Sequence, residues 1–178
     1  MRITGGTLCG RKIECPGGII RPAMDRMRES VFAILGDLSG KSFLDVFSGS
    51  GSISLEAVSR GATRVTLVEG DKKKASIVLK NVQISPVRIE CKFIPAERFL
   101  LRCKDQFDFI FFDPPFPYGF HRRLLESTVE NNLLKETGTL MIHRPSELRD
   151  LDDPIEGLTK IDQRVYGRSI VDFFKNAN

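Results

Sequence analysis

Four consecutive residues, Asp113-Pro114-Pro115-Phe116, place a carboxylate, a rigid backbone and an aromatic ring directly after the apolar run 107–112. Each proline holds its own φ at about −65° and lacks an N–H, so the backbone cannot continue here as a helix. The Asp113 carboxylate and the Pro114 carbonyl can accept the two N–H groups of a flat amino group, while Phe116 stacks on the ring that carries it. A plain strand-ending turn is the alternative, because Asp-Pro often begins a turn.

A glycine-rich turn lies upstream, after a short apolar strand predicted for residues 42–47. Gly49, Ser50 and Gly51 lead from this strand into a predicted helix over residues 52–60. Glycines let a backbone approach a ligand closely, and a helix N-terminus offers free N–H groups. Because Ser54 replaces the third glycine of a dinucleotide fingerprint, the turn fits a ligand with one nucleoside better than a dinucleotide.

The next predicted strand, residues 64–69, ends on an acid, Glu69. Glu69 follows the glycine turn by about 20 residues, the spacing at which an acid binds ribose hydroxyls in a βαβ unit. A glutamate at a strand end is more often a solvated terminus, so Glu69 alone is weak evidence. The ordered combination with the glycine turn and Asp113 to Phe116 is strong evidence for a nucleoside-containing ligand beside an amine-holding turn.

This combination resembles the S-adenosylmethionine-dependent methyltransferases that modify amino nitrogens. The resemblance implies S-adenosyl-L-methionine as cofactor and Asp113, Pro114, Pro115 and Phe116 as the residues that hold the target amine. It also implies cofactor contacts by seven residues: Asp45, Phe47, Gly49, Ser50, Gly51, Glu69 and Ala96. In this class an aspartate commonly reaches the cofactor's adenine, but the chain has Pro95 there, which leaves the backbone around Ile94 and Ala96, or Glu97, for that contact.

Length and composition favour one soluble domain. The chain has 178 residues, of which 41% are hydrophobic and 28% charged, as is ordinary for a globular protein with one core. No apolar run approaches the roughly 20 residues of a membrane span, and the N-terminus lacks an apolar signal segment. The cysteines form no C-x-x-C pair, so we expect reduced thiols, no metal site and a cytoplasmic location: Cys9, Cys15, Cys91 and Cys103.

Positive charge is concentrated at the N-terminus. Residues 1–28 contain six Lys or Arg and two Asp or Glu, and six minus two equals the whole net charge of +4. We expect a small hairpin around the bend at residues 5–10, and then a helix capped by Asp25 and running to Leu35. A solvated basic face is the usual alternative, but a polyanionic substrate needs cationic contacts, for which the candidates are Arg2, Arg11, Arg21, Arg26 and Arg28.

The N-terminal residues sharpen the resemblance. Arg2-Ile3-x-Gly5-Gly6, Gly10-Arg11-x-Ile13 and the stretch from Arg21-Pro22 to Phe32 are similar to the signature of the bacterial small-subunit ribosomal RNA guanine-N2 methyltransferases. The resemblance covers nearly the whole chain. It implies methylation of N2 of one guanine in 16S rRNA of the small subunit. We expect a monomer that acts on a small-subunit ribonucleoprotein particle, while naked rRNA, an assembly intermediate and the complete subunit all stay open as the form of the substrate. Two departures stand out: Ala23 replaces a common Thr, and His143-Arg144 stands where an acidic residue is more usual.

Strands and helices alternate along the chain in the order expected for such a fold. Strands are predicted at residues 42–47, 64–69, 88–93, 107–112, 138–143, 159–165 and 169–175, and helices at 52–60, 71–81, 97–103 and 120–132. This order predicts a Rossmann-like class I methyltransferase sheet, an α/β fold that is mostly parallel with one antiparallel strand. A basic arm over residues 1–24 precedes a methyltransferase domain over 25–178, and the ligands should meet at the carboxyl ends of the parallel strands.

Other functions share parts of this pattern. A DNA or RNA adenine-N6 methyltransferase would use the same Asp-Pro-Pro-aromatic turn, and a protein glutamine methyltransferase would hold its amide in the same way. A non-catalytic RNA-binding or ribosome-assembly factor could retain the fold, but it would have no need for Glu69 or Asp113. In the favoured mechanism the methyl group is transferred directly to an oriented amine, with reacting atoms roughly 3–3.5 Å apart.

Overall fold

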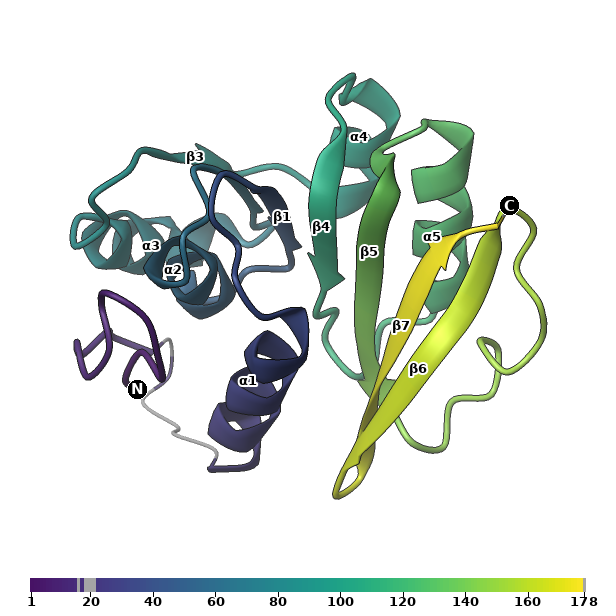
Figure 1. Ribbon diagram of the computed structural model, residues 1–178, viewed down its shortest axis with the longest axis horizontal. Helices are drawn as coiled ribbons and strands as arrows, with labels where there is room; N and C mark the ends of the chain where they lie inside the picture. Colours follow the sequence, from purple (N-terminus) through teal and green to yellow (C-terminus); the bar gives the residue numbers. More distant parts are fainter. Residues whose placement is uncertain (16, 18–21, 178) are drawn as a thin grey trace.

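Seven strands form one sheet in the order β3-β2-β1-β4-β5-β7-β6 in the computed structural model, which describes residues 1–15, 17 and 22–177 (Figure 1). Strands β1 to β5 pair in parallel, whereas β7 is antiparallel to both of its neighbours, β5 and β6. The predicted sheet, mostly parallel with one antiparallel strand, is confirmed. The strands are β1 (Ser42–Val46), β2 (Arg64–Val68), β3 (Ile89–Lys92), β4 (Phe107–Phe112), β5 (Leu134–Pro145), β6 (Leu158–Tyr166) and β7 (Ser169–Asn176).

Helices cover both faces of the sheet and bury its apolar side chains in two clusters. The first cluster packs α1, α2 and α3 on the sheet, and the second packs α4 and α5 on the other face. Figure 1 shows α2 grouped with α3, and α4 grouped with α5. The helices are α1 (Pro22–Leu35), α2 (Ser52–Ser59), α3 (Ala75–Val82), α4 (Ala96–Arg102) and α5 (His121–Glu130), with a 3-10 turn, η2 (Lys72–Lys74), before α3.

The boundaries of three elements differ from the prediction. Helix α1 begins at Pro22, so Asp25 lies in its first turn and the predicted N-cap role is wrong. Proline suits the first position of a helix because its φ is already helical and its missing N–H would have no partner there. The predicted helix 71–81 divides into η2 and α3, and β5 begins at Leu134, where a buried leucine extends the pairing with Phe107. None of the described helices is long and apolar enough to cross a membrane.

Residues 1–13 fold back on themselves as an N-terminal hairpin. Arg2 and Lys12 form one antiparallel bridge, and the Ile3 N–H donates to the Arg11 carbonyl over 3.0 Å. The inward side chains are buried with α1 and α2 in the first cluster: Ile3, Leu8 and Ile13. The hairpin therefore packs on the sheet's helical layer, and the predicted domain boundary after residue 24 falls inside α1.

The end of α2 holds this hairpin closely. Thr7 N–H donates to the Ser59 carbonyl over 2.7 Å, and Leu8 N–H donates to Ser59 Oγ over 2.8 Å. At Gly6, where φ is +75°, a Cβ atom would lie 1.8 Å from the same Ser59 carbonyl oxygen. Only glycine fits this approach, which gives Gly6 of the sequence signature a steric reason.

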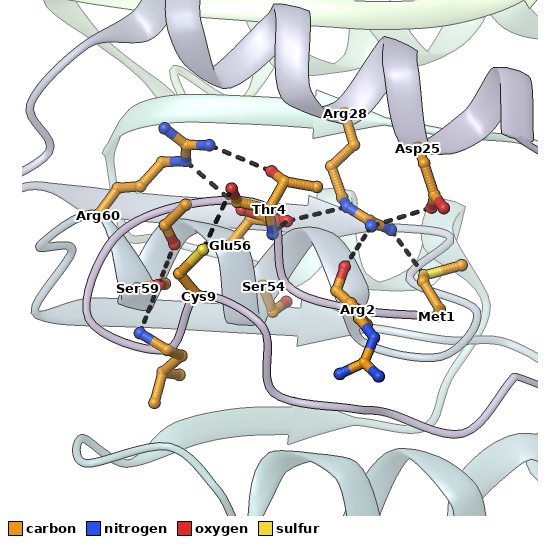
Figure 2. A network of polar contacts seen from close by, with 12 residues as sticks. Met1, Arg2, Thr4, Cys9, Asp25, Arg28, Ser54, Glu56, Ser59 and Arg60 are labelled. Carbon is orange, nitrogen blue, oxygen red and sulfur yellow. Dashed lines mark hydrogen bonds and ion pairs between the residues drawn. The ribbon is translucent and has the colours of Figure 1, made fainter.

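A buried ionic network joins the hairpin, α1 and α2 (Figure 2). Arg28 of α1 is 2% exposed, and its Nε donates to Oε1 of the fully buried Glu56 over 3.0 Å. Its Nη2 donates both to the Arg2 carbonyl over 2.6 Å and to the Asp25 carboxylate over 3.0 Å, and its Nη1 lies 2.6 Å from Met1 Sδ. Since its guanidinium is enclosed and paired, the predicted RNA contact of Arg28 is wrong, and Arg28 holds the N-terminal hairpin in place.

Replacing Arg28 should destabilise the protein strongly. The Arg28→Met variant keeps the length of the side chain but leaves Glu56 with a buried charge and only Arg60, 3.4 Å away, to balance it. Breaking a buried ion pair on one side costs about 3–5 kcal/mol of the free energy of unfolding, measurable by urea denaturation. Arg26→Met is the matched control because Arg26 is exposed on the same helix, and it should change stability by less than about 0.5 kcal/mol. Equal losses for the two variants would contradict this role of Arg28.

Candidate active site

A cavity of about 710 Å³ lies at the carboxyl ends of the parallel strands. It brings together most of the predicted site: Phe47, Gly49, Glu69, Asp113, Pro114, Pro115 and Phe116. These residues follow β1, β2 and β4. The cavity therefore lies at the carboxyl ends of the parallel strands, where the ligands were expected to meet. Six lining residues were not among the predicted contacts: Met24, Gly70, Asp71, Lys74, Pro117 and His143.

Four predicted cofactor residues lie behind the cavity rather than on its wall. Asp45 is fully buried within β1, and Ala96 is 4% exposed in the second apolar cluster at the start of α4. Ser50 presents its carbonyl to Asn81 Nδ2 over 2.9 Å. Gly51, with φ at +82°, turns the chain into α2 and faces the side chain of Leu67. The resemblance implied that these four residues contact the cofactor, but none of them lines the cavity.

The turn after β1 has an unusual backbone. Phe47 adopts φ of +64° and Gly49 a φ of +61°, both in the left-handed region. Such a conformation is strained for a phenylalanine and is often found where the backbone must present itself to a ligand. A Cβ added to Gly49 would meet nothing within 4 Å, so space remains beside its backbone. The Phe47 ring is held edge-on against Tyr118, with centroids 5.1 Å apart.

Asp45 organises this turn. Its Oδ2 accepts hydrogen bonds from Ser48 Oγ over 2.9 Å, Ser54 N–H over 3.0 Å and Ser54 Oγ over 2.6 Å. Its Oδ1 is buried without a hydrogen-bond partner among the described residues. Burial raises the pKa of Asp45 to about 6, against the lowering effect of the two serines. Ser54, noted in the sequence only as a missing glycine, therefore ties the helix start to the strand.

Glu69 closes the other side of the turn. Its Oε2 accepts the Gly49 N–H over 2.7 Å and its Oε1 accepts the Asp71 N–H over 2.8 Å, while Lys74 Nζ lies 3.7 Å from Oε2. Each carboxylate oxygen can accept a further hydrogen bond, so Glu69 can also receive ribose hydroxyls. The acid, the open backbone at Gly49 and the cavity volume fit a nucleoside-containing cofactor. Glu97, considered for adenine, accepts a hydrogen bond from the Tyr118 hydroxyl over 2.5 Å and does not line the cavity.

Asp113 is held at both its backbone and its side chain. Its N–H donates to the Val46 carbonyl over 3.1 Å, which ties the Asp-Pro-Pro-Phe turn to the end of β1. Its Oδ1 lies 2.8 Å from Nδ1 of His143, a residue that is 2% exposed. No hydrogen bond to Oδ2 is formed within the described part of the chain. The ring of Phe116 is 48% exposed beside the cavity, with its centroid 5.7 Å from that of His143.

The departure at His143-Arg144 now has a structural explanation. Because Phe112 pairs with Ile142 across β4 and β5, the residues that follow, Asp113 and His143, emerge side by side. Arg144 is 1% exposed, and its Nε donates to Oδ2 of the fully buried Asp172 in β7 over 2.5 Å. A second pair joins Arg144 to Asp152 over 3.0 Å. His143 therefore lines the cavity, whereas Arg144 connects β5 to β7.

The predicted RNA contacts differ in accessibility. Arg2, Arg11 and Arg26 are exposed, and Arg2 donates to the Gly10 carbonyl over 2.8 Å while its guanidinium points away from the buried network (Figure 2). No ion pair is formed by these three side chains with the residues that the structure describes. Arg21 lies outside the described residues. No cluster of three or more His, Cys, Asp or Glu suited to a metal ion occurs within residues 1–15, 17 and 22–177.

The raised pKa of Asp45 predicts a distinctive pH dependence of stability. Between its ordinary value of 3.8 and about 6, the unfolded chain releases the Asp45 proton while the folded protein retains it. The folded state therefore loses stability as pH rises through this window, by about 3 kcal/mol in total. Asp45→Asn, whose amide oxygen can still accept from Ser54, should lack this decline, as urea denaturation from pH 4 to pH 7 would reveal. Parallel stability curves for parent and variant would contradict the raised pKa.

Comparison with known proteins places this geometry in a family. The family model described as conserved hypothetical protein 95 matches residues 1–175. A curated relative named ribosomal RNA small subunit methyltransferase D, from Escherichia coli, is 36% identical over 79% of this chain and 69% of its own length.

Solved structures agree with this placement. A structure described as a putative methyltransferase, yhhF, from Escherichia coli superimposes with a TM-score of 0.87 at 28% identity, over 99% of this chain and 97% of that one. A more distant putative methyltransferase, SMU.776, complexed with SAH, shares the fold with a TM-score of 0.69 at 18% identity, over 88% of this chain and 50% of that one. The chain belongs to the family described as conserved hypothetical protein 95, and it is a methyltransferase.

Proposed function

We propose that this protein transfers a methyl group from S-adenosyl-L-methionine to the exocyclic N2 of a guanine in 16S ribosomal RNA. The observation that carries the proposal is the state of Asp113, whose Oδ1 is held by His143 while its Oδ2 has no partner among the described residues. This half-occupied carboxylate shares one cavity with the exposed Phe116 ring and with Glu69. The name of the Escherichia coli relative, ribosomal RNA small subunit methyltransferase D, supports ribosomal RNA as the substrate class.

Residues after β1 and β2 would hold the cofactor. Glu69 would accept hydrogen bonds from the ribose hydroxyls, and the open backbone at Gly49 would let the ligand approach the turn. Phe47 would cover the ligand with a ring that Tyr118 already fixes. When bound, S-adenosylmethionine supplies a methyl group that is already activated by its positive sulfur. The chain itself then has to position the acceptor and exclude competing water.

Residues after β4 would hold the acceptor. A guanine amino group is a weak nucleophile, because its lone pair is delocalised into the ring. Hydrogen bonds from its two N–H groups to Asp113 Oδ2 and to the Pro114 carbonyl would orient it and favour the pyramidal geometry that attack requires. Stacking on Phe116, worth about 1–3 kcal/mol, would offset the cost of taking the base out of its stack. The methylated amine is acidic enough to lose its proton after transfer, so Asp113 need not be a strong base.

The exposed arginines of α1 and of the N-terminal hairpin would bind the RNA backbone. Met24 lines the cavity, and Arg26 follows it on the same helix. Arg2, Arg11 and Lys12 are exposed on the N-terminal hairpin, which the Arg28 network fixes to that helix. Such phosphate contacts would position a folded RNA without reading its sequence. The substrate we expect is a small-subunit ribonucleoprotein particle in the cytoplasm, bound by a monomer.

The decisive experiment identifies the modified nucleoside. Purified protein is incubated with small-subunit particles that lack the modification, or with 16S rRNA, and with a cofactor that carries a labelled methyl group. Nucleosides are then separated and identified by mass spectrometry. Labelled N2-methylguanosine supports the proposal, whereas labelled N6-methyladenosine would establish an adenine methyltransferase instead. Labelled ribosomal protein without labelled RNA would indicate a protein substrate. Binding of the particle without any methyl transfer would indicate an assembly factor.

Asp113 and Glu69 should separate amine positioning from cofactor binding. Asp113→Ala removes the acceptor for the target amine, so turnover should be nearly abolished while cofactor affinity remains close to that of the parent. Glu69→Ala should instead weaken cofactor binding by roughly 1.5–3 kcal/mol, because it removes a charged hydrogen-bond acceptor. Calorimetry measures the affinity and methyl incorporation measures the turnover. Parent-like turnover of Asp113→Ala would overturn the amine-holding role.

The exposed arginines should govern RNA affinity and its salt dependence. A double variant, Arg11→Ala with Arg26→Ala, should bind RNA more weakly, and each lost phosphate contact should flatten the plot of log affinity against log salt by roughly 0.7–0.9. Cofactor affinity should not change. The matched control changes two exposed arginines near the amino ends of the parallel strands, away from the cavity: Arg88, directly before β3, and Arg102, at the end of α4. Equal salt slopes for the two double variants would mean that the N-terminal basic surface is only solvated.

A further inference from the structure

His143 is the least explained residue of the cavity. It lies near the end of β5, lines the cavity and is 2% exposed. Its Nδ1 is 2.8 Å from Asp113 Oδ1, and its Nε2 is buried without a hydrogen-bond partner within the described residues. The single polar contact of the ring is therefore with the carboxylate that we expect to hold the substrate amine.

The chemistry of the pair fixes the direction of this hydrogen bond. An ionised carboxylate can only accept, so the proton between the two atoms must belong to Nδ1 of His143. A neutral imidazole has one N–H, and placing it on Nδ1 leaves Nε2 as the acceptor nitrogen. The hydrogen bond thus selects one tautomer of the ring, in the way that an orienting partner commonly does for a functional histidine.

The surroundings of His143 keep the ring in this place. Phe116 meets it edge-on at an interplanar angle of 62°, and its strand neighbour Arg144 anchors the same end of β5 to Asp172 of β7. His143 itself is paired with Val171 across the antiparallel strands. Phe116, Arg144 and the pairing with Val171 together fix the position of this donor. A fixed donor at Oδ1 holds the Asp113 carboxylate in one orientation, which leaves Oδ2 available to a substrate.

We propose that His143 is a positioning residue, which holds the Asp113 carboxylate through Nδ1–H so that Oδ2 is aimed at the amino group to be methylated. This inference rests on the proposed function, because it assigns the target amine to Asp113. It adds a residue that acts through Asp113 and does not itself touch the reacting atoms. The same contact with the Phe116 ring means that His143 also supports the surface on which the base stacks.

Two substitutions test the hydrogen bond separately from the packing. His143→Leu fills a similar volume without a donor, and kcat should fall about 10- to 100-fold because the carboxylate is no longer held. His143→Asn carries an amide N–H close to the position of Nδ1, so this variant should keep most of the kcat that the Leu variant loses. The cofactor dissociation constant should stay within about 2-fold of the parent for both variants, because His143 is assigned no contact with the cofactor. Equal activity of the Leu variant and the parent would overturn the proposal, and so would equal loss in Leu and Asn variants that remain folded.

A spectroscopic measurement tests the pair without any turnover. The chain has only two histidines, His121 and His143, so nitrogen-15 NMR of the imidazoles shows two ring systems, and the His143→Asn variant identifies which is which. In the parent protein near pH 8, the ring of His143 should carry its proton on Nδ1. In Asp113→Ala the proton should move to Nε2, the usual tautomer of a free imidazole. A parent spectrum with the proton on Nε2 would overturn the proposal.

A double-mutant cycle separates this inference from the function on which it rests. If His143 acts through Asp113, changing His143 to Leu should cost much less in kcat when Asp113 is already Ala, a background whose small residual turnover can be followed with a labelled methyl group. Equal cost in both backgrounds would show that His143 acts elsewhere. Activity retained by Asp113→Ala would instead overturn the proposed function, whereas an inactive Asp113→Ala beside a fully active His143→Leu would overturn the role of His143 alone.

Discussion

Register between parallel strands is the constraint on which the rest of this molecule depends. Val46 pairs with Val68 on one side and with Phe112 on the other, and Phe112 pairs with Ile142. The next residue on each strand therefore emerges at the same edge of the sheet, which aligns Phe47, Glu69, Asp113 and His143. A shift of one residue in any pair would turn alternate side chains to the opposite face and would disperse the group. The position of the cavity therefore follows from this register.

Charged residues inside the protein secure the borders of that sheet. Arg28 and Glu56 join α1 and α2 beneath the N-terminal hairpin, while Arg144 and Asp172 join β5 and β7 at the opposite side. Burying such charges is costly unless every hydrogen-bonding group is satisfied, so they contribute less to net stability than to a unique arrangement. In both places the pair lies next to a site element: the hairpin carries exposed arginines, and Arg144 follows His143.

Much of the fold could be predicted from sequence because its signals are local. The apolar runs that end at Val46 and Phe112 and the glycine turn between Gly49 and Gly51 predicted β1, β4 and the end of the sheet at which the cavity lies. The boundaries of α1 and β5 were wrong because one depends on proline preference at a helix start and the other on pairing of Leu134 with a distant strand. Likewise Phe47, Glu69 and Asp113 reach the cavity as expected, whereas Asp45 and Ala96 are buried behind it. Pairings between residues far apart in sequence, such as Arg28 with Glu56 and Asp113 with His143, leave no mark in the local pattern.

The N-terminal hairpin alternates inward and outward side chains in a way that separates two tasks. Ile3 and Ile13 face the core, while their neighbours Arg2, Arg11 and Lys12 face solvent. Packing in the core limits which side chains can stand at the inward positions. Only the surface that the protein contacts limits the outward positions. The outward residues can therefore diversify between related proteins while the scaffold stays intact. Changes at Arg2, Arg11 and Lys12 would alter the charge of this face without disturbing the packing of Ile3 and Ile13 beneath it.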